Sequence, residues 1–205
     1  MTNIITGYDQ RLRVLAISGS LRSGSFNSAL LRAAQELAPE GMEITIFPLN
    51  EIPFYDGDVE AAGDPEPVTA LKSAIREADA VLFATPEYNH GISGVLKNAI
   101  DWASRDKGEG SLVGKPVAMM GAGGLAGTAR AQLQLQTTLT ETGALVMVKP
   151  GVLVPFPWNK FDPESRIPDE ETQGFLRNHL EAFARWIARV GEPGRVDEPS
   201  RRLAA

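Results

Sequence analysis

The chain of 205 residues contains no cysteine and only two histidines, His90 and His179. The absence of cysteine excludes disulfides, thiolate nucleophiles, CxxC redox centres and cysteine-ligated zinc or iron–sulfur clusters. The two histidines do not have the spacing of a metal-binding motif, and we expect no metal site. Any redox chemistry in this protein would therefore depend on a bound cofactor.

The sequence also lacks long apolar runs and an excess of positive charge. No run approaches the roughly 18 apolar residues of a membrane-spanning helix, and residues 1–13 lack the apolar region of a signal peptide. The formal charge of −6 argues against general nucleic-acid binding, which usually requires a basic face. We therefore expect a cytoplasmic protein that binds neither nucleic acid nor a membrane.

The composition, with 43% hydrophobic and 22% charged residues, is typical of a globular protein. A chain of this length fits a single sheet with its helices, so we predict one domain over residues 1–205. Its core spans about residues 12–190, and the polar residues 191–205 form a frayed tail.

Short apolar runs alternate with amphipathic stretches, which is typical of βαβ units and a parallel sheet. The pattern predicts an α/β fold with a flavodoxin-like, doubly wound, five-stranded parallel sheet of order 2-1-3-4-5. In this winding a ligand lies beyond the carboxyl ends of the first and third strands. The predicted strands are 12–18, 43–47, 80–85, 116–120 and 144–148, and the predicted helices are 27–38, 67–78, 95–104, 128–142 and 169–190.

Two longer segments interrupt this alternation. Residues 50–66 are rich in proline, aspartate and glycine, and residues 150–168 contain five prolines. Because such dense proline fits neither a helix interior nor a central strand, we predict neither element in residues 150–168. The length of the first suggests an arm that reaches towards a neighbouring subunit.

Small and hydroxyl-bearing residues follow the first predicted strand, in the sequence SGSLRSGSFN over positions 18–27. Glycines let the backbone approach a ligand, and the start of the next helix offers unpaired N–H groups. Arg22 adds a charged donor suited to phosphate. The alternative is a plain N-cap cluster. However, the segment contains more hydroxyl-bearing and small residues than a helix cap requires. Since no Gly-Lys-Ser/Thr follows, the segment is not a Walker P-loop.

A second polar loop, Pro86 to His90, follows the third predicted strand. Its backbone N–H groups and the Asn89 side chain suit the heteroatom edge of a planar ring, and Tyr88 offers an apolar wall. The alternative is a proline turn with a left-handed asparagine. Proximity to the phosphate loop favours the binding interpretation.

A third glycine cluster, residues 121–127, matches the dinucleotide pattern G-x-G-x-x-A. It follows the fourth strand instead of the first, and the acid about twenty residues later, Glu141, falls within a predicted helix. We therefore interpret Gly121, Ala122 and Gly123 as a wall of the ring pocket, where a flat ligand lies against the backbone.

Four stretches together resemble the flavodoxin-like NAD(P)H-dependent FMN reductases, which include bacterial quinone and chromate reductases. They are residues 19–27, 86–89, 94–102 and 129–132, within a similarity that covers about residues 12–190. The resemblance implies bound FMN, with NADPH or NADH as co-substrate and a quinone or similar small molecule as acceptor. It also implies, together with the arm, a homodimer or homotetramer.

By this resemblance, one set of residues holds the FMN phosphate and another flanks the isoalloxazine ring. Because the flavin carries the chemistry, no catalytic side chain is required. The phosphate ligands are Ser20, Arg22, Ser25 and Asn27, with Leu21 and Phe26 lining the cradle, and the ring residues are Pro86, Glu87, Tyr88 and Asn89.

The chain departs from the family pattern at three positions. Gly91 and Ser93 replace the usual serine and proline, and Ala122 stands where a serine near the flavin is common. These positions adjoin the predicted ring site, so they bear on its hydrogen bonds and its acceptor preference. Two alternatives remain open: an electron carrier of the flavodoxin type that does not oxidise nicotinamides, and a protein of the same fold with an empty pocket.

Overall fold

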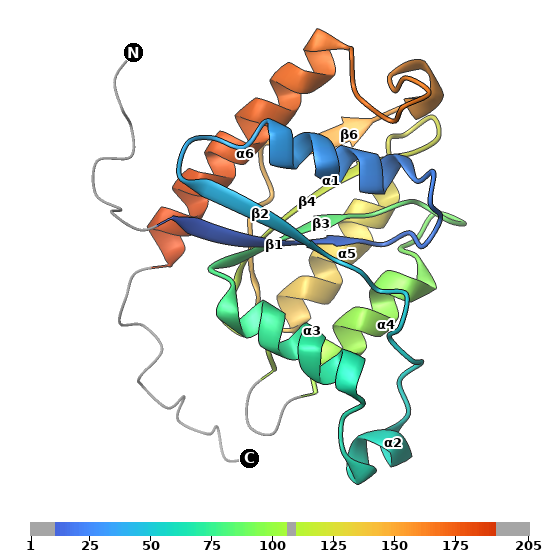
Figure 1. Ribbon diagram of the computed structural model, residues 1–205, viewed down its shortest axis with the longest axis vertical. Helices are drawn as coiled ribbons and strands as arrows, with labels where there is room; N and C mark the ends of the chain where they lie inside the picture. Colours follow the sequence, from blue (N-terminus) through green and yellow to red (C-terminus); the bar gives the residue numbers. More distant parts are fainter. Residues whose placement is uncertain (1–10, 106–109, 192–205) are drawn as a thin grey trace.

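A parallel β-sheet forms the centre of the fold, in a computed structural model that describes residues 11–105 and 110–191 (Figure 1). Every strand pair in it is parallel, in the order β2-β1-β3-β4-β5, and β6 also pairs with β4. The predicted order 2-1-3-4-5 is confirmed. The strands are β1 (Leu12–Ser18), β2 (Met42–Phe47), β3 (Ala80–Ala84), β4 (Pro116–Ala122), β5 (Leu145–Val146) and β6 (Val152–Val154).

Helices cover both faces of this sheet. They are α1 (Phe26–Glu36), α2 (Gly57–Ala62), α3 (Glu66–Glu77), α4 (Gly94–Ala103), α5 (Ala129–Glu141), α6 (Glu170–Val190) and the 3-10 helix η1 (Pro157–Asn159). The predicted helices are present with ends that differ by one or two residues. Among the residues that the structure describes, no helix has the length and apolar content needed to span a bilayer.

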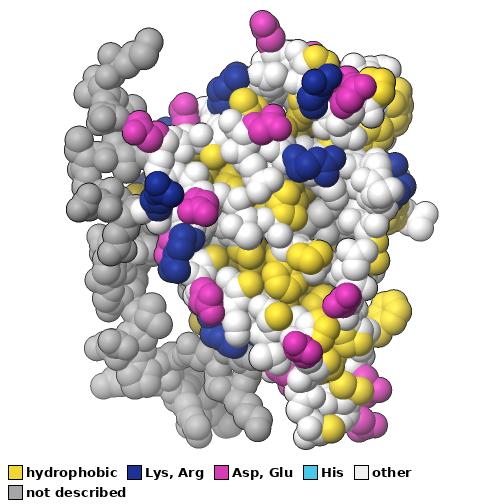
Figure 2. Space-filling model, viewed as in Figure 1, with side chains coloured by type: hydrophobic (Ala, Val, Ile, Leu, Met, Phe, Trp, Pro, Cys, Tyr) yellow, Lys and Arg dark blue, Asp and Glu magenta, His cyan; other side chains and the backbone are white. Residues whose placement is uncertain are grey.

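The two faces have separate hydrophobic cores, because successive side chains of a strand point to opposite sides. Val14 and Ala16 of β1 belong to the core beneath α1 and α6. Leu15 and Ile17 belong to the core beneath α3, α4 and α5. β3 is buried along its whole length, as expected for a strand covered on both faces. Figure 2, in the same view, shows hydrophobic side chains between α1 and α3, along the edge formed by β2.

The fifth position of the sheet is divided between two short strands. β5 lies beside the start of β4, with Pro116 opposite Leu145, and β6 lies beside its end, with Ala122 opposite Val154. The prediction of one strand over 144–148 was therefore too long. Residues 150–168, for which no central strand was predicted, contain the short edge strand β6 and the 3-10 helix η1. Proline is tolerated beside a short edge strand, which explains β6.

Side chains from two helices hold this divided edge in place. Gln132 Nε2 of α5 donates to the Val152 carbonyl at 2.9 Å, and Trp186 Nε1 of α6 donates to the Leu145 carbonyl at 2.9 Å. His179 Nδ1 lies 2.7 Å from the carbonyl oxygen of Pro150, between the two strands. These bonds replace part of the ladder that a continuous strand would have made.

The arm over residues 50–66 also contains structure that the sequence analysis missed. Asp56 accepts a hydrogen bond from the Asp58 N–H and caps α2, a helix that was not predicted. Asn98 clamps the arm to α4: its Nδ2 donates to the Pro53 carbonyl, and its Oδ1 accepts from the Tyr55 N–H, both at 2.8 Å. The arm is therefore fixed to the body of the protein.

Candidate active site

The loop after β1 is organised by its own serines. Ser25 caps α1 by accepting hydrogen bonds from the N–H groups of Asn27 and Ser28, at 3.2 and 3.4 Å. Its hydroxyl hydrogen has no acceptor among residues 11–105 and 110–191 and can donate to a ligand. Within the described parts of the chain, the N–H groups of Ser23, Gly24 and Phe26 have no protein acceptor. The loop therefore presents several donors at the start of a helix, as an anion site requires.

Arg22 is exposed at the tip of this loop. Its guanidinium lies 5.7 Å from the centre of the Phe26 ring and forms no ion pair with any described residue. A Cβ atom at Gly24 would lie 3.0 Å from Arg22 Nη1, so glycine leaves room for this side chain. The guanidinium is therefore positioned against the loop and free to meet an anion.

Asn27 joins the loop after β1 to the end of β4. Its Nδ2 donates to the Ala122 carbonyl, and its Oδ1 accepts from the Ala122 N–H, both at 2.9 Å. The side chain is buried, at 3% exposure. One amide hydrogen remains for a ligand, so the main visible role of Asn27 is to hold these two segments together.

The loop after β3 forms a tight turn. The N–H and carbonyl groups of Tyr88 and Gly91 exchange two hydrogen bonds of 3.0 Å, and Asn89 and His90 between them have φ angles of 51° and 65°. The turn with a left-handed asparagine is therefore present. It leaves the side chains of Tyr88 and Asn89 exposed at the carboxyl edge of the sheet, whereas Pro86 is buried.

The Glu87 side chain is hydrogen-bonded to the start of α5. Its carboxylate accepts hydrogen bonds from the N–H groups of Arg130 and Ala131, at 3.0 and 3.2 Å, and pairs with the Arg130 guanidinium at 3.2 Å. Burial raises the pKa of Glu87, but the Ala131 and Arg130 hydrogen bonds outweigh it and hold the pKa below its ordinary value. Glu87 thus supplies the cap that the left-handed Thr128 does not provide.

Ser93 links the loops after β1 and β3, and sequence reasoning missed this role. Its hydroxyl donates to the Gly19 carbonyl at 2.6 Å and accepts from the Leu96 N–H at 3.2 Å, which caps α4. A Cβ atom at Gly19 would lie 2.9 Å from Pro86 Cδ, so only glycine fits this approach. The available signal was a serine two positions before the first apolar residue of a helix.

Gly121 has a packing role that the sequence did not indicate. A Cβ atom there would lie 2.6 Å from the Thr85 carbonyl oxygen and against the Thr128 hydroxyl. At Gly123, a Cβ atom would lie 3.0 Å from Thr128 Cγ2. The packing of β4 against the start of α5 therefore requires glycine at position 121 whether or not a ligand is present.

The loops after β1, β3 and β4 are thus connected pairwise at one edge of the sheet. Ser93 joins the first loop to the second, Glu87 joins the second to α5, and Asn27 joins the first to the end of β4. All residues predicted to bind the cofactor lie on these segments. His179 lies elsewhere, on the buried face of α6.

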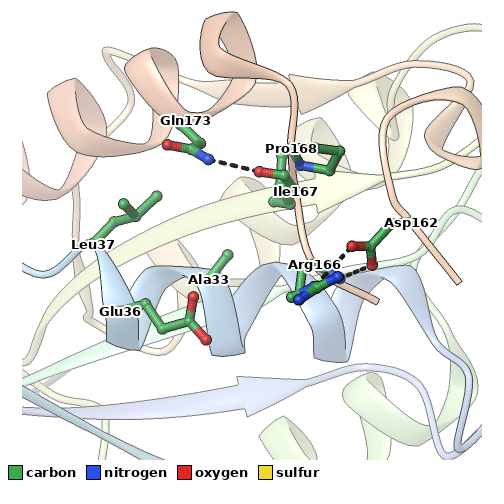
Figure 3. Close-up of a pocket in the computed structure, with 8 residues that line it drawn as sticks. All are labelled: Ala33, Glu36, Leu37, Asp162, Arg166, Ile167, Pro168 and Gln173. Atoms are coloured by element: carbon green, nitrogen blue, oxygen red, sulfur yellow. Dashed lines mark hydrogen bonds and ion pairs between the residues drawn. The ribbon is translucent and has the colours of Figure 1, made fainter. Parts of the chain in front are cut away.

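A cavity of about 320 Å³ lies at the opposite end of α1 from the Ser25 cap (Figure 3). Several of its polar groups have protein partners: Arg166 pairs with Asp162 at 2.8 Å, and Gln173 donates to the Ile167 carbonyl at 2.7 Å. None of the predicted site residues lines it. This cavity is therefore separate from the candidate active site, as is one of about 600 Å³ between α4 and α5.

Comparison with known proteins places the chain in a family. The NADPH-dependent FMN reductase family matches residues 12–159. An NAD(P)H-dependent FMN reductase of Pseudomonas aeruginosa is 47% identical over 180 residues, which are 87% of this chain and 97% of the relative. A quinone reductase of Escherichia coli is 42% identical over 185 residues, or 88% of this chain and 98% of the relative.

A solved structure shares the fold. The flavoenzyme FerB, an NAD(P)H:(acceptor) oxidoreductase of Paracoccus denitrificans, superposes with a TM-score of 0.80 at 37% identity, covering 87% of this chain and 98% of that one. The comparisons confirm the predicted flavodoxin-like fold, the oxidoreductase class, and FMN with NAD(P)H as cofactors. The chain belongs to the family of NADPH-dependent FMN reductases.

Proposed function

We propose that the protein uses NAD(P)H to reduce quinones or similar small acceptors through bound FMN. The supporting observation is the set of three loops connected at one edge of the sheet by Asn27, Glu87 and Ser93. Relatives named quinone reductase, 42% identical to this chain, support the acceptor class. The overall reaction converts NAD(P)H, a proton and a quinone into NAD(P)⁺ and a hydroquinone.

The loop after β1 would hold the FMN phosphate. Ser20, Ser25 and Arg22 would donate to the phosphate oxygens, and the free N–H groups at the start of α1 would add further donors. Asn27 would shape the cradle through its bonds to Ala122 and offer its remaining amide hydrogen. Leu21 and Phe26 would line the cradle, with Phe26 supported by Phe161, whose ring centre lies 5.3 Å away.

The loops after β3 and β4 would flank the ring. Pro86, Tyr88 and Asn89 would meet one side of the isoalloxazine, and the backbone of Gly121, Ala122 and Gly123 would meet the other. Because the Glu87 carboxylate is already bound to α5, it would position the loop without bonding the ring. The alanine at 122 offers no hydroxyl, so any hydrogen bond there would come from backbone groups.

Bound FMN supplies the redox chemistry by accepting a hydride and passing two electrons onward. The protein would bind the nicotinamide and the acceptor in turn against one exposed ring face. A single face holds one planar partner at a time, so NAD(P)⁺ leaves before the acceptor enters. We expect parallel double-reciprocal lines when the acceptor is varied at several NAD(P)H concentrations. Intersecting lines would contradict a shared site.

The visible spectrum of the purified protein tests this function directly. We expect flavin absorption bands that bleach on anaerobic addition of NADPH and return when a quinone is added. An electron carrier of the flavodoxin type would show the bands but would not bleach with NADPH. A protein with an empty pocket would show no bands.

A homodimer or homotetramer, with the arm next to a neighbouring site, completes the proposal. Phe54 supports it: the side chain is 84% exposed, while the residues on either side are clamped by Asn98. A large apolar side chain held rigidly in solvent is typical of an interface anchor. Light scattering at micromolar concentration measures the oligomeric state. A monomer that retains full activity would contradict the proposal.

The same proposal places the enzyme in the cytoplasm and treats residues 1–205 as one domain. One sheet and its two cores include elements from β1 to α6, which supports a single folding unit. Cell fractionation tests the first statement. A single cooperative unfolding transition of the FMN-loaded protein, seen by both fluorescence and circular dichroism, tests the second.

A further inference from the structure

Two neighbouring segments at the candidate active site present large apolar side chains to solvent. Leu125, in the loop after β4, is 79% exposed, and Phe156 and Trp158, after β6, are 40% and 56% exposed. We call these three residues the apolar ridge. Figure 1 places the loop after β4 next to the orange segment that follows β6, and Figure 2 shows hydrophobic side chains at the upper right of the molecule, on this side.

The position of Leu125 is fixed by both cofactor loops. Its loop begins after Ala122, which is bonded to Asn27 of the predicted phosphate loop. The same loop leads into α5, where Arg130 in the first turn is bonded to Glu87 of the predicted ring loop. Leu125 therefore stands on a short connection between the two groups of predicted FMN ligands.

The aromatic pair is attached to this same connection. The Phe156 N–H donates to the Gly124 carbonyl at 2.8 Å, and the Gly123 N–H donates to the Val154 carbonyl at 3.1 Å. The rings of Phe156 and Trp158 pack edge to face, with centres 5.7 Å apart. The two segments thus form one surface.

Phe156 is held in an unfavourable backbone conformation. Its φ angle is 48°, in the left-handed region that bulky residues rarely adopt. Such strain is retained mainly at functional sites, where it directs a side chain. Here it accompanies a ring that is partly exposed instead of buried in the core, so packing of the core does not explain it.

We propose that the apolar ridge binds the ring of the electron acceptor, which makes Leu125, Phe156 and Trp158 determinants of a preference for neutral, fused-ring quinones. The proposal rests on the proposed function. Aromatic faces and a leucine side chain match an uncharged planar ring. They offer nothing to the phosphates of a dinucleotide, and the nearest lysine in the chain, Lys160, is already paired with Asp169 at 2.9 Å.

Steady-state kinetics of the FMN-loaded enzyme with two acceptors test the ridge. The neutral probe is 2-methyl-1,4-naphthoquinone, and the charged probe is ferricyanide. In Trp158→Ala and in Leu125→Ala, we expect KM for the naphthoquinone to rise about tenfold, in line with the loss of one apolar contact. We expect KM for ferricyanide to stay within about twofold of the native value. Trp158→Phe should retain most of the naphthoquinone affinity that Trp158→Ala loses.

Phe175→Ala is the matched control. Phe175 is 57% exposed, similar to Trp158, but belongs to α6 and not to the ridge or the three loops. We expect it to leave both KM values unchanged. An equal rise of KM for both acceptors in the ridge variants, or no change in either, would overturn the proposal. Leu125 is the most exposed of the three, so its replacement by alanine should disturb folding least. Leu125→Ala therefore provides the test if Trp158→Ala does not fold.

Binding without turnover separates this proposal from the proposed function. Equilibrium dialysis of the naphthoquinone against the oxidised enzyme measures Kd directly, and we expect it to rise about tenfold in both alanine variants. If the native protein bleaches with NADPH but Kd is unaffected, only the ridge fails. If the native protein does not bleach, the proposed function fails while the dialysis still reports on the ridge. Loss of oligomers in the ridge variants without a change in Kd would assign this surface to a second copy of the chain.

Discussion

The loop after β1 and the segment from β5 to β6 are stabilised in different ways, although both lie beside the central strands. In the loop, hydrogen bonds from Ser18, Ser20 and Ser25 reach partners no more than ten residues away. In the divided edge, Gln132, His179 and Trp186 reach partners 20 to 41 residues away. The serine bonds of the first region therefore depend on local sequence, whereas the second region depends on the docking of α5 and α6. Among the described residues, long-range bonds made by side chains join the first region to its neighbours through Asn27 and the Gly19 carbonyl.

This difference separates ligand binding from folding stability. Substitutions in the loop should change the affinity for FMN and leave the protein folded. Substitutions beneath the divided edge should lower the free energy of unfolding before they affect the ligand. Four predictions test this separation, and the largest effect comes first.

His179→Ala should lower the free energy of unfolding by about 3 kcal/mol, because it opens a cavity and leaves the Pro150 carbonyl without its partner. Urea unfolding followed by circular dichroism measures this. Phe175→Ala, on the exposed side of the same helix, should change it by less than about 0.5 kcal/mol. Equal stability of the two variants would show that the edge does not depend on α6.

Arg22→Ala should weaken FMN binding by about 1.5–3 kcal/mol, or roughly ten- to 150-fold, since a charged donor to phosphate is lost. Fluorescence titration of the apoprotein with FMN measures the change. The exposed Arg32 of α1 gives a matched control, and Arg32→Ala should leave the affinity unchanged. Unchanged affinity in Arg22→Ala, with an intact fold, would remove Arg22 from the phosphate site.

Ser93→Ala should modestly lower both folding stability and FMN affinity, because Ser93 caps α4 and also donates to the Gly19 carbonyl. We expect a loss of about 1 kcal/mol in stability and a few-fold loss of FMN affinity. Ser104→Ala at the other end of α4 is the control, since that hydroxyl donates to the Asp101 carbonyl of its own helix. If FMN affinity stays constant while stability falls, the link between the loops does not contribute to binding.

The smallest effect is a pH dependence of stability. Burial lowers the pKa of His179 in the folded protein, and its bond to the Pro150 carbonyl only partly opposes this. The unfolded chain then binds the proton more readily, so this contribution to stability is complete above about pH 6.5 and declines as the pH falls below that value. His179→Gln should remove this part of the slope in urea unfolding measured from pH 5 to 8. A slope identical to that of the native protein would assign the effect to other groups.

Local signals explain what could be predicted from the sequence. Apolar periodicity gave every helix that packs on the sheet and the strand order, since both depend on alternation along the chain. The loops after β1 and β3 were located because small and polar residues directly follow buried strands. The residue roles within them are still predictions, except where the structure shows the protein's own contacts.

Long-range contacts explain what was missed. β4 extends through Gly121 and Ala122 because β6 pairs with them, and a glycine cluster gives no local indication of this. β6 lies among prolines that argue against a strand. Glu87 was expected at the ring, but its partner is the start of α5, 43 residues further along the chain. Two missed features had readable signals, the capping residue Asp56 before α2 and the serine at position 93 before α4.

The division of the fifth strand also affects how readily molecules of this protein aggregate. A long, continuous edge strand exposes a row of unpaired backbone groups on which another chain can build a sheet. Here the edge consists of two short strands, and His179 and Trp186 already occupy carbonyl groups along it. The interruption therefore works as protection against aggregation at high concentration, and a substitution that releases these carbonyls would cost solubility as well as stability.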